Sequence, residues 1–169
     1  MSLSHPKSVL ITGASSGLGR ALALAYAGHG TAIYLSGRDQ GRLDAVAEDC
    51  RQRGATAEGR TIDVTDADAM AVWIKEADEK MPLDLVIANA GITNSTSGLA
   101  DGPERTRRIL AVNVDGVVNT VLPALAAMDA RNKGQIALIA SIAGFRGLPT
   151  SSAYSASKAM VKTWGEGLR

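Results

Sequence analysis

Two residues near the end of the sequence, Tyr154 and Lys158, have the types and spacing needed for proton transfer. They lie four positions apart in YSASK, within a helical pattern, so their side chains are expected on the same face of a helix. A nearby ammonium group stabilises the phenolate form of a tyrosine, which lets the phenol donate or accept a proton near neutral pH. Tyrosine and lysine at this spacing are also common surface neighbours, so the pair alone does not establish a catalytic site.

Two further polar residues, Ser141 and Asn113, are candidates for the same site. Ser141 ends the apolar run QIALIAS and is therefore expected at the carboxyl edge of a sheet, where α/β folds bind their ligands. Its hydroxyl group could hold a substrate oxygen beside the phenol. Asn113 is a polar residue within an otherwise apolar helical pattern, and a buried hydrogen bond between helices is its alternative role.

The segment ITGASSGLG, residues 11–19, has the composition of a phosphate-binding turn. Its three glycines lie between a predicted strand and a predicted helix, where phosphates can approach bare backbone and the positive end of the helix. We expect Gly13 to permit the tight turn, Gly17 to let the backbone approach a pyrophosphate, and Gly19 to let the helix pack near the strand. The spacing is Gly-x-x-x-Gly-x-Gly, with a wider first gap than the common dinucleotide-binding pattern Gly-x-Gly-x-x-Gly, and a glycine-rich turn with no ligand is the alternative.

The end of the second predicted strand indicates which dinucleotide would fit. In NAD-binding proteins an acidic residue about 20 positions beyond the glycines usually binds the adenosine ribose. Here that strand ends at Gly37 and is followed by Arg38. A guanidinium group suits a 2′-phosphate, so NADP is favoured, with NAD possible. Two alternatives stay open: Arg38 could pair with a surface acid such as Asp39, or Asp39 could face the ribose.

Apolar runs and helical patterns alternate along the chain and would position these residues. Strands are expected at 8–12, 31–36, 61–63, 83–88 and 135–141, and helices at 17–29, 40–53, 66–80, 104–130 and from 152 onward. This order predicts an α/β fold, a doubly wound parallel sheet in three α/β/α layers, within one domain. Asp66 and Ser152 are predicted start signals, Pro123 a kink, and the turn-rich loop 93–103 a border of the site.

Composition and charge restrict the class of protein. Hydrophobic residues make up 46% of the 169 residues and the formal net charge is +1, so we expect a globular protein with a small-molecule partner, not one that binds nucleic acid or a membrane surface. Cys50, the only cysteine, is expected on a helix surface, and no metal site is expected. The first residues lack the apolar core of a signal peptide, and no apolar run approaches a membrane span, which predicts a cytoplasmic location.

These motifs together resemble the short-chain dehydrogenase/reductase family, in its common soluble branch. TGASSGLG at 12–19, NAG at 89–91, Asn113, Ser141 and YSASK at 154–158 occur in the family's order and approximate spacing. The resemblance implies a Rossmann-type fold that binds NAD(P) and transfers a hydride between nicotinamide and the carbon of a carbonyl or alcohol.

The resemblance also implies a role for each matched residue. Tyr154 would be the general acid/base, and Lys158 would favour its phenolate and hold the nicotinamide ribose. Ser141 would position the substrate oxygen, and Asn113 would support a water relay to Lys158. Asp63 and Val64 would contact adenine. The full set of cofactor-binding residues would be Gly13, Ser15, Ser16, Gly17, Leu18, Gly19, Arg38, Asp63, Val64, Asn89, Ala90, Gly91, Tyr154 and Lys158.

The sequence departs from the family pattern at its C-terminal end. Family members usually have roughly 250 residues, whereas this sequence ends at Arg169, before the sixth and seventh strands and most of the substrate pocket. We therefore expect an NAD(P)-binding domain over 1–169 that is incomplete, self-associates through the edge 136–140 and is inactive alone. In full length it is expected to form a homo-oligomer. A non-catalytic NAD(P)-binding sensor stays open, as does a methyltransferase, for which YSASK would have no explanation.

Overall fold

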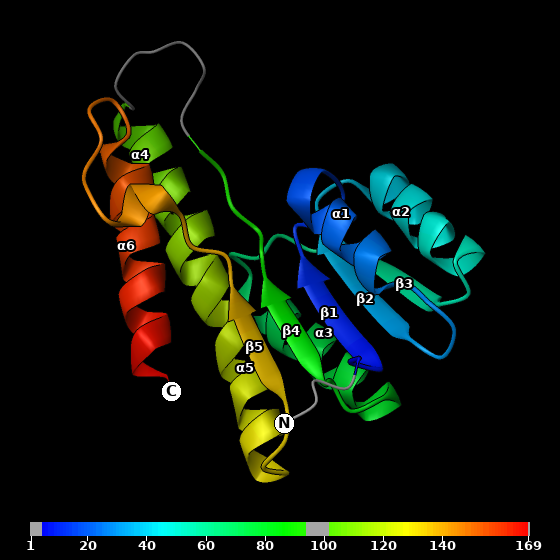
Figure 1. Ribbon diagram of the computed structural model, residues 1–169. Helices are drawn as coiled ribbons and strands as arrows, with labels where there is room; N and C mark the ends of the chain where they lie inside the picture. Colours follow the sequence, from blue (N-terminus) through cyan, green and yellow to red (C-terminus); the bar gives the residue numbers. More distant parts are fainter. Residues whose placement is uncertain (1–4, 94–101, 169) are drawn as a thin grey trace.

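The computed structural model describes residues 5–93 and 102–168 and has a parallel sheet at its centre (Figure 1). The strands are β1 (Ser8–Thr12), β2 (Ala32–Gly37), β3 (Thr56–Thr61), β4 (Leu85–Ala88) and β5 (Gln135–Leu138). They lie in the order β3-β2-β1-β4-β5, and all neighbours are parallel. The direction of winding reverses between β1 and β4, as in a doubly wound Rossmann-type sheet, so the predicted fold class is confirmed.

Helices cover both faces of this sheet. The first three are α1 (Gly17–Tyr26), α2 (Gln40–Gln52) and α3 (Ala67–Lys80). A long helical segment follows β4 and consists of α4 (Pro103–Leu110), the π-helical turn η1 (Ala111–Asp115) and α5 (Gly116–Ala130). After β5 come the short 3-10 helix η2 (Ile142–Gly144) and α6 (Ser152–Gly167), which lies beside α5 (Figure 1).

The core consists of two apolar layers, one on each face of the sheet. Val9 and Ile11 of β1 pack in a cluster with α1 and α2, whereas Leu10 packs on the opposite face with α3 and α5. Successive strand residues point to opposite faces, so a strand covered on both sides is apolar throughout. Cys50 of α2 is fully buried in the first cluster, so the expectation of a surface thiol is wrong.

Two predicted strands have different bounds in the structure. The third strand is TAEGRT (56–61) and not TID. It lies at the edge of the sheet, where its polar residues Glu58 and Arg60 are only partly buried, so it has no apolar run by which the sequence could reveal it. Asp63 therefore lies beyond the strand. The fifth strand ends at Leu138, so Ser141 also follows its strand instead of ending it.

The helix predictions need smaller changes. Asp66 caps α3 as predicted, since its side chain accepts a hydrogen bond from Ala69 N. Ser151, and not Ser152, precedes α6. The helical segment after β4 continues through Pro123, and its irregular turn is η1, ten positions earlier in the chain.

The segment Pro103–Ala130 is apolar enough to cross a membrane by length and composition, with a mean hydropathy of 1.6. This differs from the expectation that no run approaches a span. Its residues Val117 and Val121 are buried against Ala88 of β4 and Val161 of α6. Packing within the protein therefore accounts for part of its apolar character.

The last strand, β5, pairs only with β4 in the described part of the chain. Its other edge borders a groove of about 580 Å³ between α5 and α6. Ile136 and Leu138 line that groove, which places the free apolar edge where the sequence predicted it. An unpaired strand edge of this kind is a template for association.

Candidate active site

The turn between β1 and α1 is held so tightly that two of its glycines have no room for a side chain. A Cβ on Gly13 would lie 2.8 Å from Ala90 Cα, and a Cβ on Gly19 would lie 2.3 Å from the carbonyl oxygen of Gly13. Gly17 differs, because no atom lies within 4 Å of its Cβ position. Gly13 and Gly17 also have φ values of +66° and +54°, a region that favours glycine. The turn thus offers bare backbone at Gly17.

Asn89 and Thr12 fix this turn against the end of β4. Thr12 Oγ1 accepts hydrogen bonds from Asn89 N and Ala90 N, both at 3.1 Å. Asn89 Nδ2 donates to the carbonyl oxygens of Thr12 at 2.9 Å and Gly13 at 3.3 Å. Thr12 is not among the predicted site residues, although its position directly before Gly13 could have indicated a role in holding the turn. The crevice beyond these two strands is where open α/β sheets bind ligands.

A cleft of about 610 Å³ opens over the turn. It contains all the predicted cofactor-binding residues except Tyr154 and Lys158. The residues that line it are Gly13, Ser15, Ser16, Gly17, Leu18, Gly19, Gly37, Arg38, Asp39, Arg42, Ile62, Asp63, Val64, Asn89, Ala90, Gly91, Ile92, Arg108 and Val112. Its size and its bare backbone fit a dinucleotide, whose pyrophosphate would meet the N-terminus of α1.

The end of β2 makes one wall of the cleft basic. A Cβ on Gly37 would lie 3.3 Å from the side chain of Ser15, so this position has little room for an acidic side chain. Asp39 caps α2 by accepting from Arg42 N at 3.0 Å and forms an ion pair with Arg42 Nε at 3.3 Å. Arg38 is exposed and has no ion pair with a residue in 5–93 or 102–168, so a pair with Asp39 is not formed.

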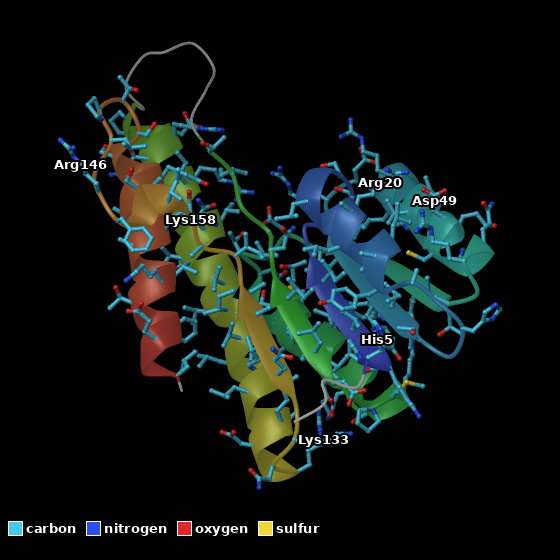
Figure 2. All side chains as sticks on the ribbon, viewed as in Figure 1. His5, Arg20, Asp49, Lys133, Arg146 and Lys158 are labelled. Carbon is cyan, nitrogen blue, oxygen red and sulfur yellow. The ribbon has the colours of Figure 1, made fainter. Side chains whose placement is uncertain are left out.

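Tyr154 and Lys158 lie in the first half of α6, and Lys158 Nζ is 5.9 Å from the centre of the Tyr154 ring. Lys158 is labelled in Figure 2. It is buried, and its Nζ donates a hydrogen bond to the carbonyl oxygen of Ile139 at 2.6 Å. Burial lowers the pKa of Lys158, because it disfavours the charged form. A lysine ammonium has three donors, so two stay available to a ligand.

Asn113 lies in η1 and is fully buried, with its amide group bonded to two other segments. Its Oδ1 accepts from Ile92 N at 2.8 Å, and its Nδ2 donates to Ile92 O at 2.9 Å and to Ser157 Oγ at 3.1 Å. Ser157 in turn donates to the carbonyl oxygen of Tyr154 at 2.7 Å. Asn113 therefore makes buried hydrogen bonds, the alternative role that its sequence context indicated. Ser157, inside YSASK, links Asn113 to the backbone of Tyr154 and was not among the predicted site residues.

Gly91 connects the cleft to the Tyr154–Lys158 pair. It lines the cleft, and its Cβ position lies 3.4 Å from Asn113 Oδ1 and 3.6 Å from Lys158 Nζ. The buried ammonium of Lys158 therefore lies next to Gly91 without lining the cleft itself, and Arg38 lies on the cleft wall at the end of β2.

Ser141 caps η2, since its Oγ accepts from Ala143 N at 3.1 Å. Gly144 holds η2 against α6, because a Cβ there would lie 2.8 Å from the carbonyl oxygen of Lys158. No hydrogen bond joins Ser141 to Tyr154 among the described residues. Of the loop predicted at 93–103, residues 94–101 lie outside the described residues.

No group of three His, Cys, Asp or Glu side chains suited to a metal ion occurs among residues 5–93 and 102–168.

Comparisons with known proteins agree with this geometry. The chain matches the short chain dehydrogenase family over residues 7–169. It is 43% identical over 164 residues to an uncharacterized oxidoreductase of Myxococcus xanthus. The aligned region covers 96% of this chain and 65% of that protein. The fold is similar to that of an NAD+-bound xylitol dehydrogenase, with a TM-score of 0.89, 29% identity, and coverage of 96% of this chain and 63% of the other. A metagenomic short-chain oxidoreductase in complex with NADP has a TM-score of 0.88 and 28% identity, with coverage of 99% and 76%.

The chain therefore belongs to the short chain dehydrogenase family, as its motifs predicted. The matched residues 7–169 include every predicted catalytic and cofactor-binding residue. The chain spans 65% of the length of the Myxococcus xanthus relative and 63% of the xylitol dehydrogenase chain.

Proposed function

We propose that the protein is an oxidoreductase that uses a nicotinamide dinucleotide to interconvert a carbonyl group and an alcohol. The observation that carries this proposal is the closeness of two groups: Gly91 lines the cleft over the glycine turn, and its Cβ position lies 3.6 Å from Nζ of the buried Lys158, which is beside Tyr154. Two similar structures are described with NAD+ or NADP bound, which supports the same class of cofactor here. A protein that only binds a nucleotide would have no use for a phenol and an ammonium group at this place.

The residues around Tyr154 would handle the proton of the reaction. The bound nicotinamide supplies or accepts the hydride at the substrate carbon. In the reducing direction Tyr154 Oη gives its proton to the carbonyl oxygen, and in the oxidising direction it takes the proton of the alcohol. The Lys158 ammonium stabilises the phenolate that forms and has two donors left for the ribose hydroxyls.

Ser141 and Asn113 would have supporting roles. Ser141, held beside α6 through η2, would position the substrate oxygen. The amide of Asn113 is already bonded to Ile92 and Ser157, so we assign its side chain to holding the cleft wall against α6. A water relay to Lys158 would therefore have to use groups other than the side-chain amide of Asn113.

We further propose that NADP is preferred over NAD. Gly37 has little room for the acidic side chain that would bind a ribose diol, and Asp39 is engaged with Arg42. Arg38 is exposed on the cleft wall and is available to a 2′-phosphate.

The test is turnover and binding by the intact protein. NADPH binding is measured by fluorescence titration, and turnover with a panel of small ketones and secondary alcohols by NADPH absorbance. We expect NADPH binding and turnover of at least one class of substrate. Binding of S-adenosylmethionine in place of NADPH would contradict the proposal.

Two properties of the intact protein stay predictions: a cytoplasmic location and a homo-oligomeric state. Native mass spectrometry or light scattering measures the second. A homo-oligomer is expected because β5 and the groove beside it present apolar groups.

A further inference from the structure

The Asp63 carboxylate is held on both of its oxygens at one wall of the cleft. Asp63 Oδ1 accepts hydrogen bonds from Thr65 N at 3.1 Å and Thr65 Oγ1 at 2.9 Å. Asp63 Oδ2 accepts from the guanidinium of Arg108 at 2.5 Å. The Thr65 bonds are local, but Arg108 comes from α4, 45 positions along the chain.

The same helical segment also holds Val64, the next residue. Asn119 Nδ2 of α5 donates to the carbonyl oxygen of Val64 at 3.0 Å. A Cβ on Gly116 would lie 2.5 Å from Val64 Cγ2, so α5 packs directly against this side chain. The segment after β3 is therefore fixed from the helices after β4, and Arg108 is the residue among these that reaches the carboxylate.

Arg108 keeps the carboxylate both oriented and charged. Partial burial acts to raise the pKa of Asp63, but hydrogen bonds from Arg108 and Thr65 outweigh it and lower that pKa. An ionised carboxylate only accepts hydrogen bonds. It therefore attracts an amino group and repels a carbonyl oxygen at the same position.

We propose that Arg108 is a positioning residue that sets the base selectivity of the cleft, by holding Asp63 as an acceptor for the exocyclic amino group of adenine. The proposal rests on the proposed function, because it takes the cleft to be the dinucleotide site. Arg108 and Asp63 both line that cleft, with side chains 37% and 35% exposed. Both are therefore open to a base while paired with each other.

The test compares two cofactors that differ only at the base. NADPH carries adenine, and its deamino analogue carries hypoxanthine, in which a carbonyl oxygen replaces the amino group. Dissociation constants for both are measured by fluorescence titration in the intact protein, with R108L, R108K and the matched control R107L. Arg107 lies on the same helix, is exposed and does not line the cleft, so its loss changes charge without removing the contact.

In the parent we expect the deamino analogue to bind about tenfold more weakly than NADPH, the size of one hydrogen bond to a charged group. R108L should bring this ratio below about threefold by weakening NADPH, R108K should recover part of it, and R107L should leave it unchanged. The pair is partly exposed, so R108L should remain folded by circular dichroism. Should R108L not fold, the ratio measured with R108K decides and should lie below that of the parent, because the lysine ammonium does not reproduce the contact of Arg108 Nη2 with Asp63 Oδ2.

Three results would overturn the proposal. A loss of affinity that is equal for both cofactors would mean that Arg108 acts without regard to the base. A ratio near one in the parent would mean that Asp63 does not recognise the amino group. Absence of binding of either dinucleotide to the parent would overturn the proposed function itself, which separates that failure from the other two.

Discussion

The glycine turn and the region around Lys158 form the two ends of the proposed dinucleotide site, and they differ in what builds them. At the glycine turn the surface is backbone, and Gly13 and Gly19 are packed so closely that an added Cβ would overlap neighbouring main-chain atoms. At the Lys158 end the surface is made of side chains, which are held by hydrogen bonds from other segments: Asn113 to Ile92 and Lys158 to Ile139.

This difference predicts different sensitivities. The glycine turn should fail when atoms are added, because main chain cannot move aside cheaply. The Lys158 end should fail when polar atoms are removed, because their buried partners are then left without hydrogen bonds. Substitutions of each kind test this difference between the two ends.

The largest effect is expected for Tyr154→Phe, which removes one oxygen atom at the side-chain end. General acid–base catalysis contributes about 10²–10⁴-fold, so turnover in the intact protein should fall by about that factor. NADPH affinity should stay within about threefold of the parent, because the turn that would hold the phosphates is untouched. Steady-state rates and fluorescence titration measure the two quantities, and turnover within about tenfold of the parent would contradict the role of Tyr154.

A smaller effect, now on stability, is expected for Asn113→Ala. It leaves the backbone N–H and carbonyl of Ile92 and the hydroxyl of Ser157 without their buried partner. We expect a loss of about 3 kcal/mol in the free energy of unfolding. Urea unfolding measures it, with Asn119→Ala, which removes one hydrogen bond to Val64, as the comparison. Equal losses of unfolding free energy in the two variants would show that the three hydrogen bonds of Asn113 stabilise the protein no more than the single one of Asn119.

Gly19→Ala tests the backbone end in the opposite way, by adding one carbon atom. Its Cβ would lie 2.3 Å from the Gly13 carbonyl oxygen and 2.6 Å from Asn89 Nδ2. The turn must shift, and we expect a loss of about 1–3 kcal/mol of stability together with weaker NADPH binding. Gly28→Ala is the control, since no atom lies within 4 Å of that Cβ position. Stability of Gly19→Ala equal to that of Gly28→Ala would refute the tight packing.

The smallest effect is expected for Arg38→Asp, because Arg38 is exposed and makes no ion pair with another described residue. The parent should prefer NADPH to NADH by about tenfold in kcat/KM, and the variant should shift this preference toward NADH. Stability should change by less than about 0.5 kcal/mol. Equal kcat/KM for both cofactors in the parent would rule out the assigned role of Arg38.

The comparison also explains which parts of the molecule could be predicted from the sequence. The glycine turn is a local feature, with its strand, glycines and helix adjacent in the chain, and its residue types follow from the close approach of backbone. The parallel sheet with helices on both faces followed from the alternation of apolar runs and helical patterns. The third strand was misplaced, because Glu58 and Arg60 at an edge give it no apolar run.

The long-range hydrogen bonds around the site could not be predicted in the same way. Asn113 and Ile92 are 21 positions apart, and Asp63 and Arg108 are 45 apart. Both contacts depend on how α4 and η1 lie against the end of the sheet, and no spacing rule gives that. Ser157 could not be predicted for a related reason, because its hydrogen bond with Asn113 depends on how α6 packs against η1.

The most direct test of the proposal that one dinucleotide occupies both ends of this site is a crystal structure of the intact protein with NADPH. We predict the pyrophosphate at Gly17, the 2′-phosphate at Arg38 and the nicotinamide ribose bonded to Lys158 Nζ. A dinucleotide bound elsewhere, or one whose nicotinamide half lies away from Lys158 and Tyr154, would contradict it.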